Sequence, residues 1–211
     1  MKHMNHFKQT KKRNLSSIVL LTVLVVSMFF LSACGNKKAP VVELSDLTNF
    51  PVADMSGYAG LKNYNQSVKF VDVTVKDVDT FLKEGKSFVL LTSFAECPWC
   101  NAIIPYLCDA ASEAQATIAL IDTRKDPSWK NNFDLLDYDL FAEDFGEYLA
   151  TDEGDRPHLY VPHVFFIKDG KVVYQHQGAL AEMGDNPHME LTNKQKEELR
   201  DIYRDGFRAI E

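Results

Sequence analysis

The chain has 211 residues, 45% of them hydrophobic, and a formal net charge of −7 at pH 7. This acidic balance argues against nucleic-acid binding and against electrostatic attachment to an anionic membrane surface. The four cysteines, one of which is assigned below to lipid, are too few for a disulfide scaffold.

Residues 1–33 have the layout of a secretory signal. Five Lys or Arg and no acid precede or flank an apolar run from Ile18 to Leu31. The run is shorter than the roughly 20 apolar residues that a membrane-spanning helix needs. It ends in Leu-Ser-Ala-Cys-Gly around Cys34, which resembles a bacterial lipobox. We therefore predict cleavage before Cys34 and acylation of its sulfur, with an ordinary signal peptide or an uncleaved anchor as the alternatives.

The sequence then divides into three predicted parts: a lipoprotein signal peptide (1–33), a lipidated tether with an irregular lead-in (34–65) and a folded domain (66–211). The lead-in is rich in Gly, Pro and Asn and has no sustained hydrophobic period. Acyl chains would anchor the domain, because each buried CH2 contributes about 0.8 kcal/mol. The predicted location is extracytoplasmic, on a bacterial membrane.

Strands and helices alternate in the first half of the folded domain. A short strand over 68–73 leads to a helix that Thr74 caps and that ends near Gly85. Two apolar strands, over 87–94 and 117–122, flank a helix over 98–115. This is a strand, helix, strand unit.

The second half of the domain predicts a hairpin and a closing helix. No strand is predicted between residues 123 and 160. An Asp-Gly turn at 169–170 joins strands over 164–168 and 172–175. The last helix covers 192–210. In the first stretch, one helical face carries Phe141, Phe145, Tyr148 and Leu149. In the last helix, the side chains predicted to point inward are Leu199, Ile202, Tyr203 and Phe207.

Cys97-Pro98-Trp99-Cys100 lies between the strand over 87–94 and the following helix. Two thiols three residues apart close a disulfide if a first turn of helix brings them together. The first thiol then lies at a helix N-terminus, where free backbone N–H groups and the macrodipole favour the thiolate. The pattern predicts a redox dithiol with Cys97 as nucleophile. Half of a zinc site is the alternative, but no second cysteine pair completes it.

Several further offsets resemble the thioredoxin superfamily. Pro105 lies eight residues after Cys97, Val161-Pro162 precedes the hairpin, and Gly178 lies eight residues after Gly170. Among exported relatives, the chain most resembles lipoprotein thioredoxin-like proteins of the bacteriocin-transport-accessory type. The resemblance implies an α/β, thioredoxin-like three-layer fold with a central mixed sheet and a helical insertion before the cis-proline strand.

The resemblance also implies a thiol-disulfide oxidoreductase whose only redox group is the Cys97–Cys100 disulfide, with no other cofactor and no metal. Cys97 would attack a substrate disulfide, and Cys100 would resolve the mixed disulfide. Pro162 would be cis and face the thiols, and the Val161 backbone would pair with an extended substrate. Trp99 and Pro98 would shape the substrate surface. Expected partners are exported proteins or peptides with thiols or disulfides and a membrane or extracytoplasmic redox partner.

The sequence departs from the superfamily pattern at three places. Leu91 stands where thioredoxins have a buried aspartate, and Glu96 stands where they usually have tryptophan. The charge of Glu96 is expected to oppose a thiolate at Cys97. The segment between Asp122 and Pro162 is also longer than in a minimal thioredoxin. The direction of electron flow therefore stays open.

The remaining cysteine and the histidines allow other functions. Cys108 lies roughly 16 Å along the helix from Cys97, so we expect a buried structural thiol rather than a third redox group. His163 follows Pro162 and is expected near the dithiol, where it would tune Cys97 or complete a copper or zinc site. A metallochaperone-like protein and a redox-sensing interaction module are thus the alternative functions. Surface or turn positions are expected for the other histidines of the domain: His158, His176 and His188.

Overall fold

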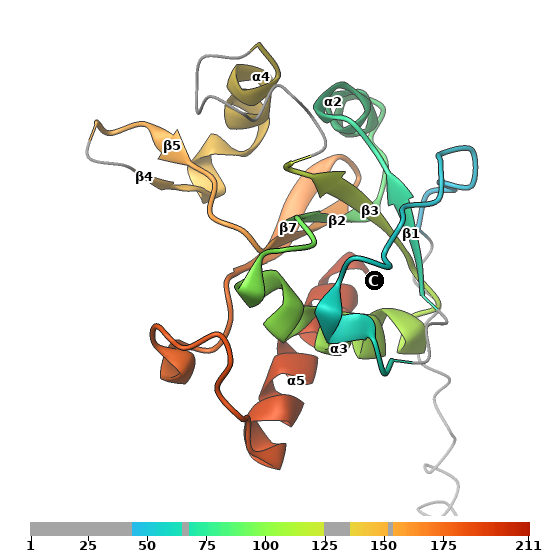
Figure 1. Ribbon diagram of the computed structural model, residues 1–211. Coiled ribbons are helices and arrows are strands. Elements are labelled where there is room, and N and C mark those ends of the chain that lie inside the picture. Colours follow the sequence, from blue (N-terminus) through green and yellow to red (C-terminus); the bar gives the residue numbers. More distant parts are fainter. Residues whose placement is uncertain (1–43, 65–67, 125–135, 152–153) are drawn as a thin grey trace, which may run out of the picture. The chain divides into compact units, whose positions relative to one another are not determined.

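Five strands form a central mixed sheet in the order β1-β3-β2-β6-β7 (Figure 1). Strands β1, β3 and β2 are parallel, while β6 runs antiparallel to β2, and β7 to β6. The bounds of these strands are β1 (Lys69–Asp72), β2 (Phe88–Ser93), β3 (Thr117–Asp122), β6 (His163–Lys168) and β7 (Lys171–Gln177).

This computed structural model describes residues 44–64, 68–124, 136–151 and 154–211. The predicted signal peptide and the predicted lipid-attachment residue, Cys34, lie outside these ranges. Within them, no helix combines the length and the apolar character that crossing a membrane requires.

Helices cover both faces of the sheet (Figure 1). Helices α2 (Val75–Lys83) and α4 (Leu136–Phe145) lie on one face, and α3 (Pro98–Glu113) and α5 (Asn193–Ile210) lie on the other. Each face buries its own hydrophobic cluster. The predicted thioredoxin-like three-layer α/β fold is confirmed, and α4 is the predicted helical insertion before the strand β6.

Local sequence explains most element boundaries. The Thr74 side chain accepts a hydrogen bond from the Asp77 backbone, and Asp77 accepts one in return from the Thr74 backbone, so a capping box starts α2. All six residues of β2 are buried, as expected for a strand covered on both faces. Asp169 and Gly170 have φ values of 50° and 73°, which is the conformation that a tight hairpin turn requires.

The stretch between α4 and β6 contains two short strands, β4 (Ala150–Thr151) and β5 (Pro157–His158), which pair antiparallel. The prediction of no strand between residues 123 and 160 is therefore wrong. Two residues are too few to show an alternating pattern, so only the pairing reveals them. The Tyr138 hydroxyl donates to the Pro157 carbonyl at 3.1 Å and accepts from the Leu159 N–H at 2.9 Å, which ties this hairpin to α4.

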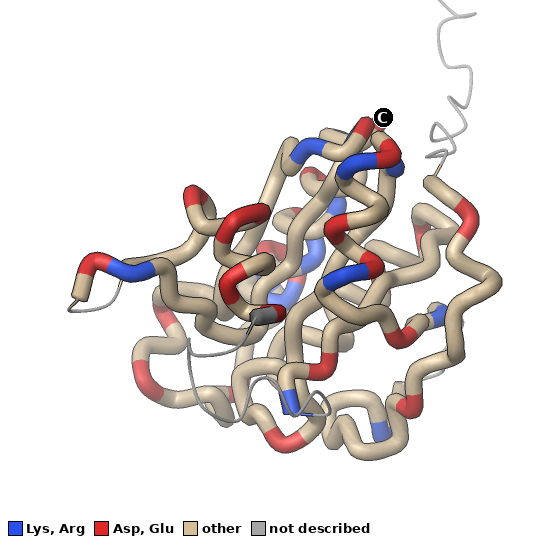
Figure 2. The backbone as a smooth tube through the Cα atoms, turned by 90° about the horizontal axis from the view of Figure 1, so that it is seen from above, with Lys and Arg blue, Asp and Glu red and all other residues tan. Residues whose placement is uncertain are grey.

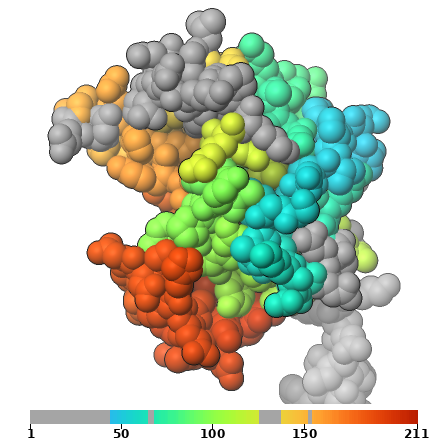
Figure 3. Space-filling view, in the orientation of Figure 1, coloured from blue at the N-terminus to red at the C-terminus, as the bar shows by residue number. Residues whose placement is uncertain are grey.

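The lead-in from residue 44 packs on the domain. Its side chains Leu47, Tyr58 and Leu61 are buried, and Val52 forms an antiparallel bridge with Val71 of β1. The 3-10 turn η2 (Ala59–Leu61) contacts α3, where the Gly60 N–H donates to Asn101 Oδ1 at 2.9 Å. Figure 3 shows this segment, in cyan, against the green residues of α3. The lead-in thus lies beside the first turn of the helix that carries the cysteine pair.

Gly60 makes this contact sterically demanding. A Cβ at Gly60 would lie 2.2 Å from the Asn101 carbonyl oxygen. We expect Gly60→Ala to lower the free energy of unfolding by about 1–3 kcal/mol, because backbone has to move to relieve the overlap. Denaturant unfolding measures this, with Ala59→Ser at the exposed neighbouring position as the control. Equal stability of the two variants would contradict the contact.

Helix α5 is held on α3 by buried side chains and by ion pairs at the rim. Leu199, Tyr203 and Phe207 are buried against the sheet and α3. Arg200 contacts Asp109 and Arg204 contacts Glu113, each at 2.7 Å. Figure 2 shows basic and acidic residues interspersed along the described backbone. Since ion pairs that remain partly exposed to solvent contribute little, the apolar face of α5 is the main source of its stability.

Candidate redox site

The cysteine pair lies at the N-terminus of α3. Cys97 is the N-cap residue, and its Sγ accepts a hydrogen bond from the Cys100 backbone N–H at 3.2 Å. Both cysteines are free thiols and both are buried, with 4% of Cys97 and 1% of Cys100 exposed. The Cys97 sulfur therefore lies at the start of α3, where the unpaired backbone N–H groups of the first helical turn stabilise negative charge.

The two thiols differ in acidity. The hydrogen bond from the Cys100 thiol, helped by backbone N–H groups of Cys100 and Trp99, lowers the pKa of Cys97 to about 7 against the opposing effect of burial. Burial raises the pKa of Cys100, and the hydrogen bond to Cys97 raises it further. Near neutral pH, Cys97 is about half ionised and Cys100 keeps its proton. Cys97 is therefore the nucleophile, and Cys100 remains a protonated thiol.

The loop before β6 lies against Cys97. The Val161–Pro162 peptide bond is cis, and the Cys97 thiol donates to the Val161 carbonyl at a distance of 3.8 Å. Pro162 is buried and Val161 is half-buried. The structure therefore brings Val161 and the cysteine pair together.

Pro98 and Trp99 differ in their surroundings. Pro98 is exposed and lines a hollow of about 500 Å³ between the start of α3, the lead-in near Gly60 and the loop at His188. Trp99 is half-buried and packs against the hydrophobic cluster of the α3 face. Pro98 thus faces an open hollow beside the dithiol, while part of Trp99 is used in packing.

Glu96 does not act on Cys97 as an unpaired charge. Its carboxylate lies 3.3 Å from the guanidinium of Arg124, which follows the end of β3 and also stacks over the Phe94 ring at 3.8 Å. The charge of Arg124 contributes to the lowered pKa of Cys97. The expected opposition by Glu96 is therefore offset by a cation that sequence reasoning missed. The sequence did carry a signal for this pairing, because Glu96 follows β2 and Arg124 follows β3, and these parallel neighbours end at the same sheet edge.

Three polar residues beside the dithiol were also not predicted. The Asn101 side chain donates to the carbonyls of Ala95 at 2.7 Å and Cys97 at 2.9 Å, which fixes the turn that carries Cys97. Ser93, at the end of β2, is fully buried and accepts a hydrogen bond from the Tyr58 hydroxyl at 3.1 Å. No sequence signal places Tyr58 here, because the lead-in has no periodicity.

His163 is not directed at the dithiol, so this expectation was wrong. Its ring stacks on Phe165 at 4.0 Å, and Phe165 belongs to the hydrophobic cluster on the α2 and α4 face. The cysteines belong to the opposite face. Burial lowers the pKa of His163 to about 4, and its Nε2 lies 2.6 Å from Gln175 Oε1. No group of three or more metal-ligating side chains occurs among the described residues.

The other predicted minor residues have mixed outcomes. Cys108 is fully buried, and burial raises its pKa to about 12, as expected for a structural thiol. His188 is exposed, whereas His158 lies in β5. The expected surface position of His176 is wrong. This residue lies in β7, is half-buried, and packs edge to face on Tyr203, with 5.7 Å between the ring centroids.

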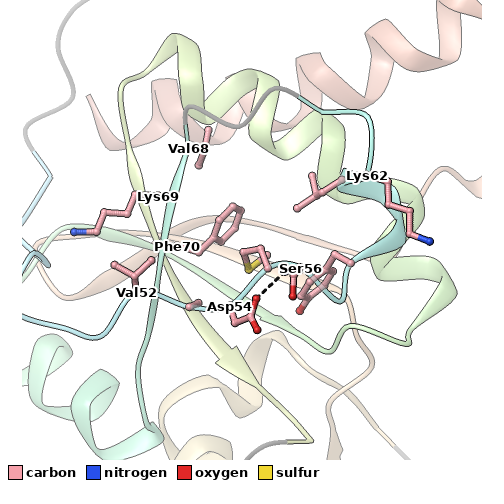
Figure 4. Close-up of a pocket in the computed structure, with 11 residues that line it drawn as sticks. Val52, Asp54, Ser56, Lys62, Val68, Lys69 and Phe70 are labelled. Carbon is pink, nitrogen blue, oxygen red and sulfur yellow. Dashed lines mark hydrogen bonds between the residues drawn. The ribbon is translucent and has the colours of Figure 1, made fainter.

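A second cavity, of about 530 Å³, lies between the lead-in and β1 (Figure 4). Its wall includes Phe70 and Val68, and the Ser56 N–H donates to Asp54 Oδ1 at 2.9 Å on one side. Lys62 and Lys69 point away from it on opposite sides. No cysteine or histidine lines this cavity, so the candidate site for redox chemistry is the dithiol.

Comparison with known proteins finds similarity to solved structures. No protein-family model matches this chain, and no curated protein sequence matches it. The crystal structure of thioredoxin from Aeropyrum pernix is similar over 51% of this chain and 74% of its own, with a TM-score of 0.34 and 19% sequence identity. The strand order and the flanking helices of this chain are themselves thioredoxin-like.

Proposed function

We propose that this chain is a thiol-disulfide oxidoreductase that acts on exported proteins or peptides. The observation that carries the proposal is the unequal pair at the start of α3: Cys97 with its pKa lowered to about 7, and Cys100 with its pKa raised by burial. A thiolate that attacks and a neighbouring protonated thiol that follows are what disulfide exchange requires.

In the proposed reaction, the Cys97 thiolate attacks one sulfur of a substrate disulfide and displaces the other as a thiolate. Cys100 then attacks the Cys97 sulfur, so the internal disulfide forms and the substrate leaves reduced. The reverse sequence oxidises a substrate dithiol. The Val161 carbonyl lies 3.8 Å from Cys97 Sγ, and the Val161–Pro162 peptide bond is cis. Val161 and Pro162 are the proposed contacts for an extended substrate, together with Pro98 and Trp99.

We further propose that the protein is extracytoplasmic and held on a bacterial membrane by lipid at Cys34. The support is the sequence: a basic start, an apolar run too short to span a bilayer and a lipobox-like end. The finer likeness to the bacteriocin-transport-accessory type belongs to this proposal. So do a membrane or extracytoplasmic redox partner and the absence of nucleic acid as a partner.

The alternative functions receive less support from the geometry. A copper or zinc site that joins the cysteines to His163 would need the imidazole on the dithiol face, whereas it stacks on Phe165 on the other face. A redox-sensing interaction module would use the same dithiol but without turnover. Turnover therefore separates the two remaining functions.

The test is an assay of multiple turnovers on a disulfide-bonded protein, with the oxidised and reduced chain in separate reactions. We expect the chain to reduce insulin with a dithiol as electron source, or to oxidise a dithiol peptide with glutathione disulfide as electron acceptor. Its reduction potential against glutathione fixes the direction, since 30 mV corresponds to about 1.4 kcal/mol for a two-electron couple. A wild-type chain that catalyses neither reaction would disprove the proposed function.

A further inference from the structure

The thiol of Cys100 is poorly placed to ionise without help. Only 1% of the residue is exposed, and burial raises the pKa of its thiol. In the proposed function, however, this sulfur has to attack the mixed disulfide at Cys97 and gains thiolate character as it does so. Because water is excluded, the developing charge has to be stabilised by neighbouring side chains.

Ser93 is the hydroxyl that meets this thiol. It is fully buried at the end of β2, and its hydroxyl hydrogen-bonds the Cys100 thiol, an interaction that lowers the pKa of Cys100 against the effect of burial. Alternation along the strand places Ser93 on the same face as Leu91 and Val89, which belong to the cluster around the cysteines.

Tyr58 is the hydrogen-bond donor to Ser93. It comes from the lead-in, is 1% exposed, and its hydroxyl donates to Ser93 Oγ at 3.1 Å. Burial raises the pKa of Tyr58, so the phenol keeps its proton and acts as a donor. Because Tyr58 occupies the acceptor side of the Ser93 oxygen, the single hydrogen of Ser93 is left for the sulfur of Cys100.

We propose that Tyr58 and Ser93 form a hydroxyl chain that stabilises the Cys100 thiolate during resolution of the mixed disulfide. Ser93 touches the reacting sulfur and is the catalytic member; Tyr58 orients Ser93 and is a positioning residue. This inference rests on the proposed function and deepens it. It makes the lead-in, which carries Tyr58, a part of the site.

Resolution of the mixed disulfide exchanges one sulfur–sulfur bond for another. Cys100 gives up its proton, and its sulfur attacks the Cys97 sulfur of the mixed disulfide. The Cys97–Cys100 bond forms as the bond from Cys97 to the substrate sulfur breaks, and the departing substrate thiolate takes a proton. The two electrons lost by the dithiol reduce the substrate disulfide, and the hydroxyl chain lowers the cost of the intermediate charge without being consumed.

Other titratable groups lie around the Tyr58–Ser93 hydroxyl chain. Asp122 of β3 acts electrostatically on Tyr58. Burial raises the pKa of Tyr203 of α5, and the nearby charge of Cys100 raises it further. His176 of β7 packs on Tyr203, and Arg124 acts on Cys97. All of them stay in place in the variants below, so a change in pH dependence between variants reports on the hydroxyls.

The experiment follows the two steps separately in the reduced full chain. Glutathione disulfide is added, samples are quenched with acid, and mass spectrometry counts three species: the reduced chain, the glutathionylated chain and the internal disulfide. Ser93→Ala and Tyr58→Phe remove one hydroxyl each, and Ser93→Thr keeps it. Tyr64→Phe is the matched control, because the Tyr64 hydroxyl also belongs to the lead-in and bonds α3, but at Asp109, 2.9 Å away.

We expect Ser93→Ala to leave the first step within about twofold and to slow the second about tenfold, the order expected for losing a hydrogen bond to a charged atom. The glutathionylated chain then accumulates, and the pH profile of the second step moves to higher pH. Tyr58→Phe should act in the same direction with a smaller effect. Ser93→Thr should restore the rate, and Tyr64→Phe should change neither step.

An unchanged second step and pH profile in both Ser93→Ala and Tyr58→Phe would overturn the proposal, as would equal slowing of both steps in these variants. If Ser93→Ala does not fold, the comparison of Tyr58→Phe with Tyr64→Phe decides. A wild-type chain that forms neither the glutathionylated species nor the internal disulfide contradicts the proposed function itself. A wild type that forms both, alongside unaffected variants, refutes only the hydroxyl chain.

Discussion

Replacing Cys97 with serine should lower the rate of disulfide exchange by at least about a thousandfold. A serine hydroxyl does not ionise near neutral pH, so the variant keeps the N-cap geometry but has no nucleophile at the start of α3. Insulin reduction and dithiol oxidation measure the loss, whichever of the two reactions the wild type performs. Circular dichroism should show an unchanged fold, because the substitution differs from the wild type by one atom.

The partner variant Cys100→Ser should stop the reaction halfway. Cys97 still attacks, but the thiol that resolves the mixed disulfide is missing, so the chain remains linked to its substrate and the covalent complex is visible on a non-reducing gel. Cys108→Ser is the control, because that thiol is fully buried with its pKa raised to about 12. Loss of turnover in Cys108→Ser with turnover kept in Cys97→Ser would reverse the assignment of the two sites.

The alkylation rate of Cys97 should follow a titration with a midpoint near pH 7. The hydrogen bond from the Cys100 thiol and the backbone N–H groups lower its pKa to about 7 from the ordinary value of 9.0. At pH 7 about half of Cys97 is then ionised, whereas only about one part in a hundred of a thiol with a pKa of 9.0 is ionised at that pH. Iodoacetamide labelling of the reduced chain, followed by mass spectrometry of the Cys97 peptide, measures the profile. A midpoint near 9 would contradict the geometry.

The same titration predicts the sign of a stability change. Because the pKa of Cys97 is lower in the folded than in the unfolded chain, its contribution is fully present above pH 9 and is lost as the pH falls through about 7. The reduced chain should therefore gain stability relative to the oxidised chain between pH 6 and about 8.5. The oxidised chain is the control, since its disulfide has no such proton.

Arg124→Gln should move the alkylation midpoint of Cys97 upward, and by less than the full shift because Arg124 is exposed.

Much of the fold follows from local patterns that act over a few residues. The capping box at Thr74, the apolar run of β2 and the Asp169-Gly170 turn each select one conformation by short-range sterics and hydrogen bonds. Helix α5 follows from a strong 3.6-residue period. The strands β4 and β5 were missed because two residues are too few to show an alternating pattern, so only their pairing reveals them.

By itself, the sequence determined the order of the longer helices and strands and the position of the dithiol at a helix start, because these depend on spacing and backbone conformation. Tertiary structure decided which side chains meet at the sulfurs. It turned His163 to the opposite face, paired Glu96 with Arg124, and brought Tyr58 from the lead-in to Ser93. The physical reason is that the acidity and reactivity of a buried thiol depend on burial and on hydrogen bonds from residues distant in sequence, which no local pattern records.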